Sequence, residues 1–312
     1  MFMKKGLVGV GLAALLTLSA MAEEGTTTNA VPSQEEIAKM INNPLSYLWM
    51  MAMQNDTWFY DGDMPGADKV TVNRFTVMPI MPMQLTEEYK LVVRPWLPIY
   101  TDKLPWGEKE NFSWTGGEIG MGLPSGISET DWKSGIGDMG MWAALATNEN
   151  AKPPFVWGVG VTAMFDTASK EQYGTGYNSA GPMGLAFYLG DKWIVGGILQ
   201  HWWDYSGKGT QANHDGVSLT DLQYVLRYRV GADTYVGMAP DLSYNWKTET
   251  WNVPVGGGFD TLIKIGPLPV KIGMETYYYA KHGSDQLHNE WQLRIFFVPV
   301  LPSPDWSHHP LF

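Results

Sequence analysis

The stretch LTDLQYVLRYRV, residues 219–230, alternates between two kinds of side chain with a period of two. One face carries apolar and aromatic groups, and the other carries polar and charged groups: Leu222, Tyr224, Leu226, Tyr228 and Val230 against Asp221, Gln223, Arg227 and Arg229. Strict alternation is typical of a β-strand that separates an apolar from a polar environment. The stretch is also long for a globular strand, whose usual length is about five to six residues.

The same texture extends from Leu45 to Pro302. It divides into twelve segments bounded by turn-forming residues: 46–60, 68–85, 89–101, 136–147, 155–168, 178–190, 193–206, 217–230, 234–246, 251–265, 269–281 and 289–301. Tight turns rich in Gly, Pro and acidic residues alternate with longer polar loops. The connection at 148–154 is intermediate, and the one at 247–250 is short where the alternation calls for a long one.

Long strands with one apolar face, joined alternately by short turns and long loops, are the pattern of a transmembrane β-barrel. Backbone groups in lipid must all be paired, so such a sheet closes, and an even strand number is the rule for bacterial chains of this type. We therefore predict an all-β fold, a 12-stranded antiparallel up-and-down barrel. The alternative is a soluble secreted β-sandwich or barrel, which would bury its aromatic residues centrally.

Aromatic residues lie near the segment ends, as expected for the two interfacial girdles of a membrane barrel. The residues in question are Trp58, Phe59, Tyr60, Trp96, Tyr100, Trp193, Trp202, Trp203, Tyr205, Trp246 and Trp251.

Composition excludes several classes of protein. Of 312 residues, 45% are hydrophobic, 13% aromatic and 17% charged, against roughly 25% charged in ordinary soluble domains. Disordered chains show the opposite balance. Beyond the N-terminus no run of about 18 apolar residues could span a bilayer as a helix. Without cysteine there are no disulfides, Cys-ligated zinc, Cys nucleophiles or lipidated N-terminal Cys.

The N-terminus has the features of a secretory signal. Lys4 and Lys5 precede an apolar stretch, 6–18, and an A-x-A pattern ends at Ala22, so we expect residues 1–22 to be a signal peptide cleaved after Ala22. Residues 23–44 then form a polar leader with a short helix that begins at the capping box Ser33-Gln-Glu-Glu36. Residues 45–302 form the barrel domain and 303–312 a C-terminal tail.

An exported chain starts on the periplasmic side, so the odd-numbered connections face outward. Two of these are acidic: Asp61, Asp63 and Asp68 meet no base, and 102–135 holds six acids against three bases. The formal net charge of −11 also makes nucleic acid an unsuitable partner.

The polar faces of the strands point into a lumen if the alternation is correct. The candidate lining residues for solute binding are Lys90, Arg94, Asp221, Arg227, Arg229, Lys271, Glu275 and Arg294, with Asp204, Gln223 and Glu290 beside them. Facing lipid, such charges cost about 2–4 kcal/mol each near mid-membrane. Two interpretations stay open: an eyelet whose Arg and Lys residues select anionic solutes, or a filled barrel in which the charges pair with one another.

Other patterns predict no catalytic, nucleotide or metal site. Gly256-Gly257-Gly258 and Gly135-Ile136-Gly137 lack the Lys-Ser/Thr pair and following helix of a phosphate loop, and strand glycines mark bulges or close backbone approach. The six histidines match no ligand spacing. Ser206 and His201 are close in sequence, but no nucleophile motif surrounds them, so an outer-membrane phospholipase is the weaker alternative. We expect no enzyme activity, cofactor or metal.

An ordered series of short motifs resembles a known family. In chain order these are Asn43-Pro44-Leu45, Gln54-Asn55-Asp56, Pro79-Ile80-Met81-Pro82, Arg94-Pro95-Trp96-Leu97-Pro98, Gly135-Ile136-Gly137-Asp138, Trp157-Gly158-Val159-Gly160, Ser179-Ala180-Gly181-Pro182, Trp251-Asn252-Val253-Pro254-Val255-Gly256-Gly257-Gly258 and Trp291-Gln292-Leu293-Arg294. The chain resembles the outer-membrane transporters of the phenol-degradation meta-pathway type, often mislabelled bacterial neuromedin U, over roughly residues 43–299. The resemblance implies a Gram-negative outer-membrane barrel with a role in solute passage.

The expected function is passive uptake of small solutes, with aromatic or anionic ones as candidates. The alternative from another class is a non-conducting structural or adhesion barrel that acts through its acidic outer loops. Expected partners are outer-membrane lipid, the solute and the outer-membrane assembly machinery. The last is expected because Phe312 resembles the C-terminal aromatic of barrel proteins. Pro302, Pro304 and Pro310 separate Phe312 from the last strand.

Overall fold

The computed structural model describes residues 38, 40–43, 46–64, 66–102, 114–115, 118–119, 132–148, 154–210, 214–285 and 287–301. The predicted signal peptide 1–22, the predicted tail 303–312, most of the predicted leader 23–44 and most of the loop 102–135 lie outside the described residues. Ala38, Met40 and Ile41 have helical backbone, as expected for the end of the leader helix. Among the described residues, no helix has the length and apolar character needed to cross a membrane.

The strands of the main sheet are β1 (Trp49–Asp61), β2 (Thr71–Gln84), β3 (Tyr89–Asp102), β6 (Lys133–Ile136), β7 (Met139–Thr147), β8 (Phe155–Phe165), β9 (Tyr177–Leu189), β10 (Trp193–Gly207), β11 (Ser218–Arg229), β12 (Thr234–Met238), β13 (Asp241–Asn245), β14 (Thr250–Ile265), β15 (Leu268–Lys281) and β16 (His288–Leu301). Short 3₁₀ turns, η2 (Ala67–Lys69) and η3 (Glu171–Tyr173), lie in two connections. A separate small hairpin consists of β4 (Trp114–Thr115) and β5 (Glu118–Ile119).

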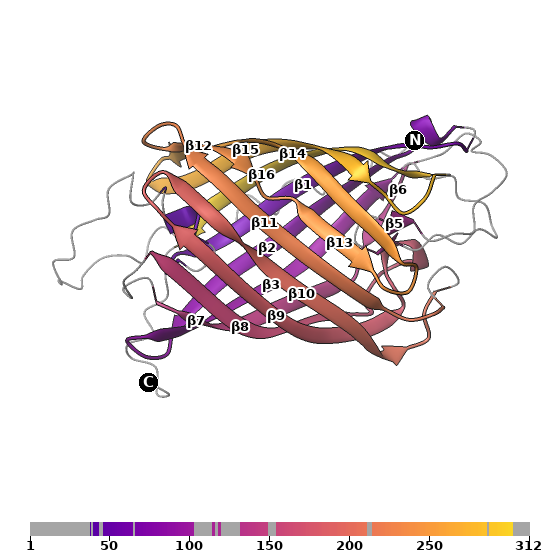
Figure 1. The fold of residues 1–312 in the computed structure, drawn as a ribbon, viewed down its shortest axis with the longest axis horizontal. Helices are drawn as coiled ribbons and strands as arrows, with labels where there is room; N and C mark the ends of the chain where they lie inside the picture. Colours follow the sequence, from indigo (N-terminus) through magenta and orange to yellow (C-terminus); the bar gives the residue numbers. More distant parts are fainter. Residues whose placement is uncertain are drawn as a thin grey trace, which may run out of the picture. The chain divides into compact units, whose positions relative to one another are not determined.

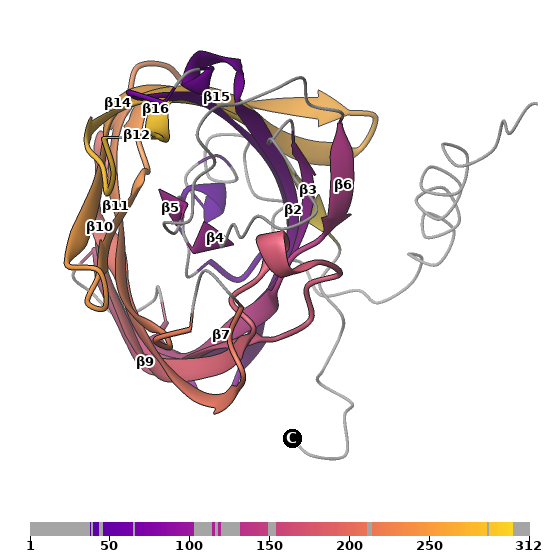
Figure 2. The ribbon, with the colours of Figure 1, turned by 90° about the vertical axis from the view of Figure 1, so that its right-hand side faces the viewer.

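The main sheet is closed. Each strand pairs antiparallel with its neighbours, β1 pairs with both β2 and β16, and the ring is completed between β10 and β11. Of its 14 strands, β6 and β7 both pair with β3 and fill one place in the ring, and β12 with β13 fills another. The described residues therefore form a 12-stranded barrel, which confirms the predicted fold class (Figures 1 and 2).

Two of the twelve predicted segments are interrupted. The segment predicted over 136–147 begins at Lys133 and breaks at Gly137 and Asp138, and that predicted over 234–246 breaks at Ala239 and Pro240. Pro240 has no N–H to give to the ladder. The polar groups of Ala239 are satisfied from the lumen instead, since its N–H donates to the Tyr277 hydroxyl at 3.0 Å and its carbonyl accepts from Arg294 Nη1 at 2.8 Å.

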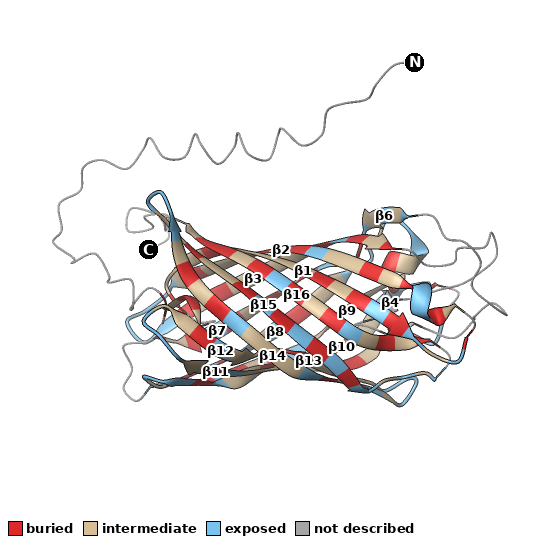
Figure 3. Cartoon of the chain, turned by 90° about the horizontal axis from the view of Figure 1, so that it is seen from above, coloured by how far each residue is buried: buried red, intermediate tan, exposed pale blue. Residues whose placement is uncertain are grey.

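Successive residues along each strand alternate between the two faces of the wall, as the sequence predicts (Figure 3). On β16, Trp291 and Ile295 are 44% and 49% exposed on the outer surface, whereas Gln292 and Arg294 are each only 3% exposed in the lumen. An outer surface of this kind suits a hydrocarbon environment. The triple glycine of β14 also has a structural cause, because a Cβ on Gly256 or Gly258 would collide with carbonyl oxygens of β15.

The aromatic girdles are only partly as predicted. Trp193, Trp203, Tyr205, Trp246 and Trp251 are exposed on the outer face near strand ends. The prediction is wrong for five others, which face inward: Trp58, Tyr60, Trp96, Tyr100 and Trp202. Nearness to a strand end does not determine which face a side chain is on, because adjacent residues of a strand point to opposite faces.

The two ends of the barrel differ. The turn end carries the connections 85–88, 190–192, 230–233 and 266–267, and the loop end carries the connections after β1, β3, β8, β10, β13 and β15. Seen from the loop end, β4 and β5 lie within the ring of barrel strands (Figure 2).

Candidate functional site: the barrel lumen

The half of the lumen next to the turn end is filled by apolar side chains. They come from almost every strand of the ring and form one cluster that includes Met50, Val92, Ala144, Ala146, Val156, Met183, Leu185, Phe187, Leu189, Ile194, Ile198, Tyr235, Leu262, Phe296 and Val298. Burial of this much apolar surface stabilises the closed sheet. It also leaves little space for a solute at this end.

The segment that precedes β1 enters the same half of the lumen. Ala38 and Ile41 are 2% and 6% exposed within the apolar cluster. Asn42 is held between two strands, because its Oδ1 accepts a hydrogen bond from Lys271 Nζ at 2.6 Å and its Nδ2 donates to Asp260 Oδ1 at 3.3 Å. The Lys90 ammonium lies 4.3 Å from the centre of the Tyr47 ring, a cation–π contact. The segment thus occludes the turn end.

A cluster of paired charges lies beside this segment. Arg227 Nη1 is 2.8 Å from Asp260 Oδ2, an ion pair without hydrogen-bond alignment, and Arg227 Nη2 donates to Glu275 Oε1. Lys271 Nζ is 3.8 Å from Asp260 Oδ1. All four side chains face the lumen from β11, β14 and β15, which lie within four consecutive places of the ring, and every charge has an opposite partner.

Asp56 is the centre of a second network, at mid-barrel. Its carboxylate is fully buried and accepts four hydrogen bonds: from Gln292 and Arg294 on Oδ1, at 2.7 and 2.8 Å, and from Gln54 and Arg74 on Oδ2, at 2.8 and 3.0 Å. Arg294 Nη2 also donates to Asp241 Oδ2 at 2.8 Å. A buried carboxylate is stable when its lone pairs are satisfied in this way.

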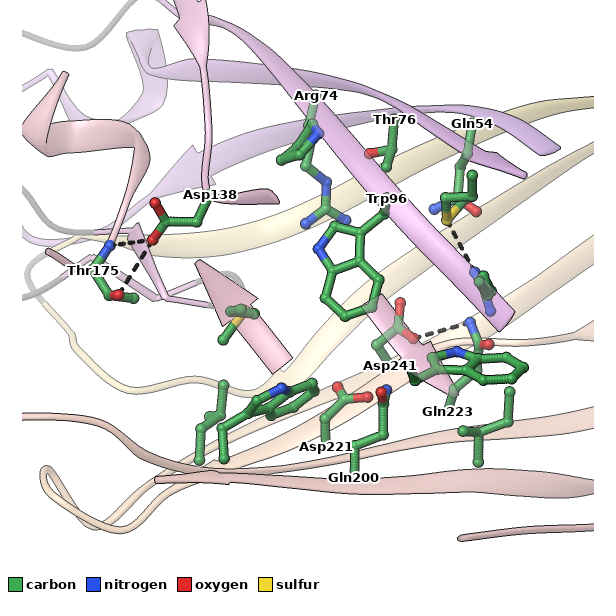
Figure 4. Close-up of a pocket in the computed structure, with 18 of the residues that line it drawn as sticks. Gln54, Arg74, Thr76, Trp96, Asp138, Thr175, Gln200, Asp221, Gln223 and Asp241 are labelled. Carbon is green, nitrogen blue, oxygen red and sulfur yellow. Dashed lines mark hydrogen bonds between the residues drawn. The ribbon is translucent and has the colours of Figure 1, made fainter. Parts of the chain in front are cut away.

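The half of the lumen next to the loop end contains a cavity of about 230 Å³. Aromatic rings and polar groups share its wall, which is formed by Gln54, Trp58, Arg74, Thr76, Met78, Arg94, Trp96, Pro98, Tyr100, Asp138, Trp142, Met164, Tyr173, Thr175, Ile198, Gln200, Trp202, Val217, Leu219, Asp221, Gln223, Asp241, Tyr279 and Gln292. Figure 4 shows Arg74 and Trp96 on one side of this space and Asp221 and Gln200 on the facing side.

Near the loop end, Asp138 fixes the connection between β8 and β9. Its carboxylate accepts hydrogen bonds from the backbone N–H groups of Thr167, Ala168 and Thr175, at 3.1, 3.1 and 2.7 Å, and from the Thr175 hydroxyl at 3.2 Å. This connection supplies Tyr173 and Thr175 to the cavity wall.

The structure places seven of the eight predicted lining residues in the lumen but divides them between the two halves. Arg94 and Asp221 line the cavity, and Arg294 lies at mid-barrel. Lys90, Arg227, Lys271 and Glu275 belong to the filled half. Arg229 lies at the turn end, where its Nε donates to the carbonyl of Gly231 at 3.0 Å.

Of the residues beside them, Gln223 lines the cavity, and Asp204 accepts the Val217 N–H at the start of β11.

Sequence reasoning missed the acids that hold these cations in place, namely Asp56, Asp241 and Asp260, and it missed Arg74. In β1 both faces carry large apolar side chains, so alternation gives no contrast around Asp56. The spacing of two residues could have indicated the position of Asp56, because it places Asp56 on the same face of β1 as Gln54 and Trp58.

Among the described residues no group of three His, Asp, Glu or Cys side chains is suited to hold a metal ion. His282 and His288 stack with ring centres 3.6 Å apart, and His214 contacts Asp215 at 3.4 Å. His201 faces outward with Nδ1 2.7 Å from Thr220 Oγ1, whereas the Ser206 hydroxyl accepts a hydrogen bond from Asn178 at 3.1 Å. Ser206 and His201 thus have separate partners.

The fold is that of the outer-membrane β-barrels. No family model and no curated protein matches the chain. Among solved structures, the COG4313 outer membrane channel from Pseudomonas putida F1 is similar, with a TM-score of 0.58 at 13% identity over 82% of this chain and 97% of that chain. This likeness shows the fold alone.

Two further barrels match with lower scores. Outer membrane phospholipase A from Escherichia coli has a TM-score of 0.40 at 14% identity, over 88% of this chain and 100% of that chain. The Pseudomonas putida toluene transporter TodX has a TM-score of 0.40 at 9% identity, over 84% of this chain and 92% of that chain.

Proposed function

We propose that this chain is a channel of the Gram-negative outer membrane that admits small solutes by passive diffusion. The observation that carries the proposal is the cavity of about 230 Å³ inside a barrel whose outer face is apolar. A barrel that served only as a scaffold would gain stability from filling this space, because an unfilled core cavity is destabilising. We also propose that the chain is cleaved after Ala22, that the outer-membrane assembly machinery inserts it, and that it is a member of the meta-pathway transporter family.

Transport requires movement at the turn end, because Ala38, Ile41 and Asn42 occupy the lumen there. The segment is attached to the lumen through side chains, among them the Asn42 amide, the Tyr47 ring and the apolar groups of Ala38 and Ile41. Its displacement leaves the backbone ladder of the wall intact, whereas opening the wall would leave backbone groups unpaired.

Conductance in planar bilayers tests the proposal. Purified protein is expected to show discrete ion-conducting steps and to accelerate the swelling of liposomes in small solutes. Absence of both would favour the non-conducting structural or adhesion barrel. A lipase assay in detergent, with and without calcium, tests the phospholipase alternative, for which we expect no activity.

The anion-selective eyelet is a separate part of the proposal. Arg94, Arg227 and Arg294 are the cations on which it depends, and replacing all three by Gln is expected to abolish any preference for anions. An unchanged preference would remove the eyelet and leave the channel.

A further inference from the structure

Two charged side chains of the cavity wall stand apart from the paired networks. Arg94 donates from Nη2 to Met78 Sδ at 3.0 Å, and its buried Nε has no hydrogen-bond partner among the described residues. A thioether is a weak acceptor. Asp221 accepts no hydrogen bond and forms no ion pair within the described part of the chain, although every other carboxylate that lines the cavity does.

These two groups face each other across the lumen. Arg94 lies on β3 and Asp221 on β11, with four places of the ring, β7 to β10, between them on one side and six on the other. Both line the same cavity. Once the Arg74–Asp56 and Arg294–Asp241 pairs are set aside, the wall presents one guanidinium and one carboxyl group that form no ion pair within the described residues, on nearly opposite sides.

The space between them is aromatic. Trp58, Trp96, Trp142 and Trp202 all contribute to the wall, and the Nε1 of Trp202 is buried without a partner among the described residues. Tryptophan rings favour a flat, apolar ligand body through stacked or edge contacts. A cavity of about 150 Å³ holds one benzene molecule, so the space of about 230 Å³ accommodates one ring with small substituents.

Unpaired buried charges are costly, and a ligand that pairs both of them gains the most. A carboxylate matches the guanidinium of Arg94 through charge-assisted hydrogen bonds. An amino or hydroxyl donor matches Asp221. A ligand with the carboxylate alone would leave Asp221 unpaired in a partly apolar chamber, and a ligand with the donor alone would leave Arg94 unpaired.

We infer that the cavity is a binding site for monocyclic aromatic acids that also carry a hydrogen-bond donor, with Arg94 and Asp221 as the residues that determine specificity. This inference rests on the proposed channel function and names its solute class. It differs from a simple anion eyelet, because it requires the ligand to carry a carboxylate and a hydrogen-bond donor together.

Calorimetric titration of the purified barrel in detergent tests the inference, with 4-aminobenzoate, 3-aminobenzoate, benzoate and aniline as probes. We expect the wild-type chain to bind one of the aminobenzoates about tenfold more tightly than benzoate or aniline, the effect of one added hydrogen bond to a charged group. Equal affinities for all four probes in the wild-type chain would overturn the inference, and this comparison needs no variant.

Two substitutions assign the roles. Asp221→Asn is expected to bring aminobenzoate close to benzoate, and Arg94→Gln to bring it close to aniline. Arg229→Gln and Asp215→Asn make the same chemical changes outside the cavity and are expected to leave every affinity unchanged. If neither cavity variant alters the ranking of the probes, Arg94 and Asp221 do not determine specificity.

Conductance measured on the same samples separates the two proposals. A conducting barrel that binds all four probes equally keeps the channel function and loses this inference. A non-conducting barrel that still ranks the probes as expected keeps the site and loses the channel.

Discussion

The half of the lumen next to the turn end and the half next to the loop end both contain inward charges and apolar side chains, but the first is filled and the second contains a cavity. In the turn half Arg227, Lys271, Asp260 and Glu275 neutralise one another, and apolar side chains fill the remaining space. In the loop half Arg94 and Asp221 stay unpaired beside a cavity. The difference teaches that an inward charge on a barrel strand is not by itself a sign of a binding site, because its partner across the lumen decides whether it serves stability or a ligand.

The largest expected difference between the halves is in stability. Arg227→Met leaves Asp260 and Glu275 with fewer partners in the filled half and is expected to cost about 3–5 kcal/mol, as for other broken buried pairs. Arg94→Met removes no ion pair and is expected to cost less than about 1 kcal/mol. Urea unfolding in lipid vesicles, followed by tryptophan fluorescence, measures both. Equal losses would mean that the two halves do not differ as described.

The second comparison concerns occlusion of the turn half. Ile41→Asp places a carboxylate in the apolar cluster, where its desolvation costs several kcal/mol, so the segment is expected to leave the lumen. Single-channel conductance should then rise several-fold. Val230→Asp, on an exposed turn at the same end, is the control and should conduct as the wild type does. Unchanged conductance in Ile41→Asp would show that the segment does not limit passage.

A third effect concerns the wall of the loop half. Asp138→Ala removes a carboxylate that accepts four hydrogen bonds from the connection between β8 and β9. A hydrogen bond to a charged group contributes about 1.5–3 kcal/mol, so this connection is expected to become a site of proteolytic cleavage while the barrel stays folded. Limited proteolysis with mass spectrometry locates the cut. Thr248→Ala, in the connection after β13, serves as the control and should add no cut at 166–176.

The smallest expected effect is on ion selectivity, to which the unpaired charges of the loop half contribute. Arg94→Gln is expected to shift the reversal potential under a salt gradient toward cation preference, and Asp221→Asn toward anion preference, each by a few-fold or less in permeability ratio. The shifts are opposite because the two charges are of opposite sign and neither is neutralised by a partner. Shifts of the same sign would contradict the view that Arg94 and Asp221 contribute opposite charges to the cavity.

Much of the barrel was predictable because its cause is local. Strand number, strand positions and the inward direction of Arg94, Arg227, Glu275 and Arg294 follow from alternation, which reflects the lipid on one side of every strand. The alternation of side chains does not indicate where a strand is interrupted, because an interruption can depend on a single backbone N–H group. The break at Ala239 and Pro240 depends on a missing N–H and on Tyr277 and Arg294, which are distant in sequence.

The sequence by itself determined the fold class and the face of most strand residues, since a period of two needs no knowledge of neighbours. Only the tertiary structure decided which charges are paired and where space remains. Those outcomes depend on closure of the ring, which brings Asp56 to Arg294, Arg227 to Asp260 and Asn42 to Lys271, and leaves Arg94 and Asp221 on nearly opposite walls. Contacts across a lumen join residues far apart in the chain, and no local pattern records them.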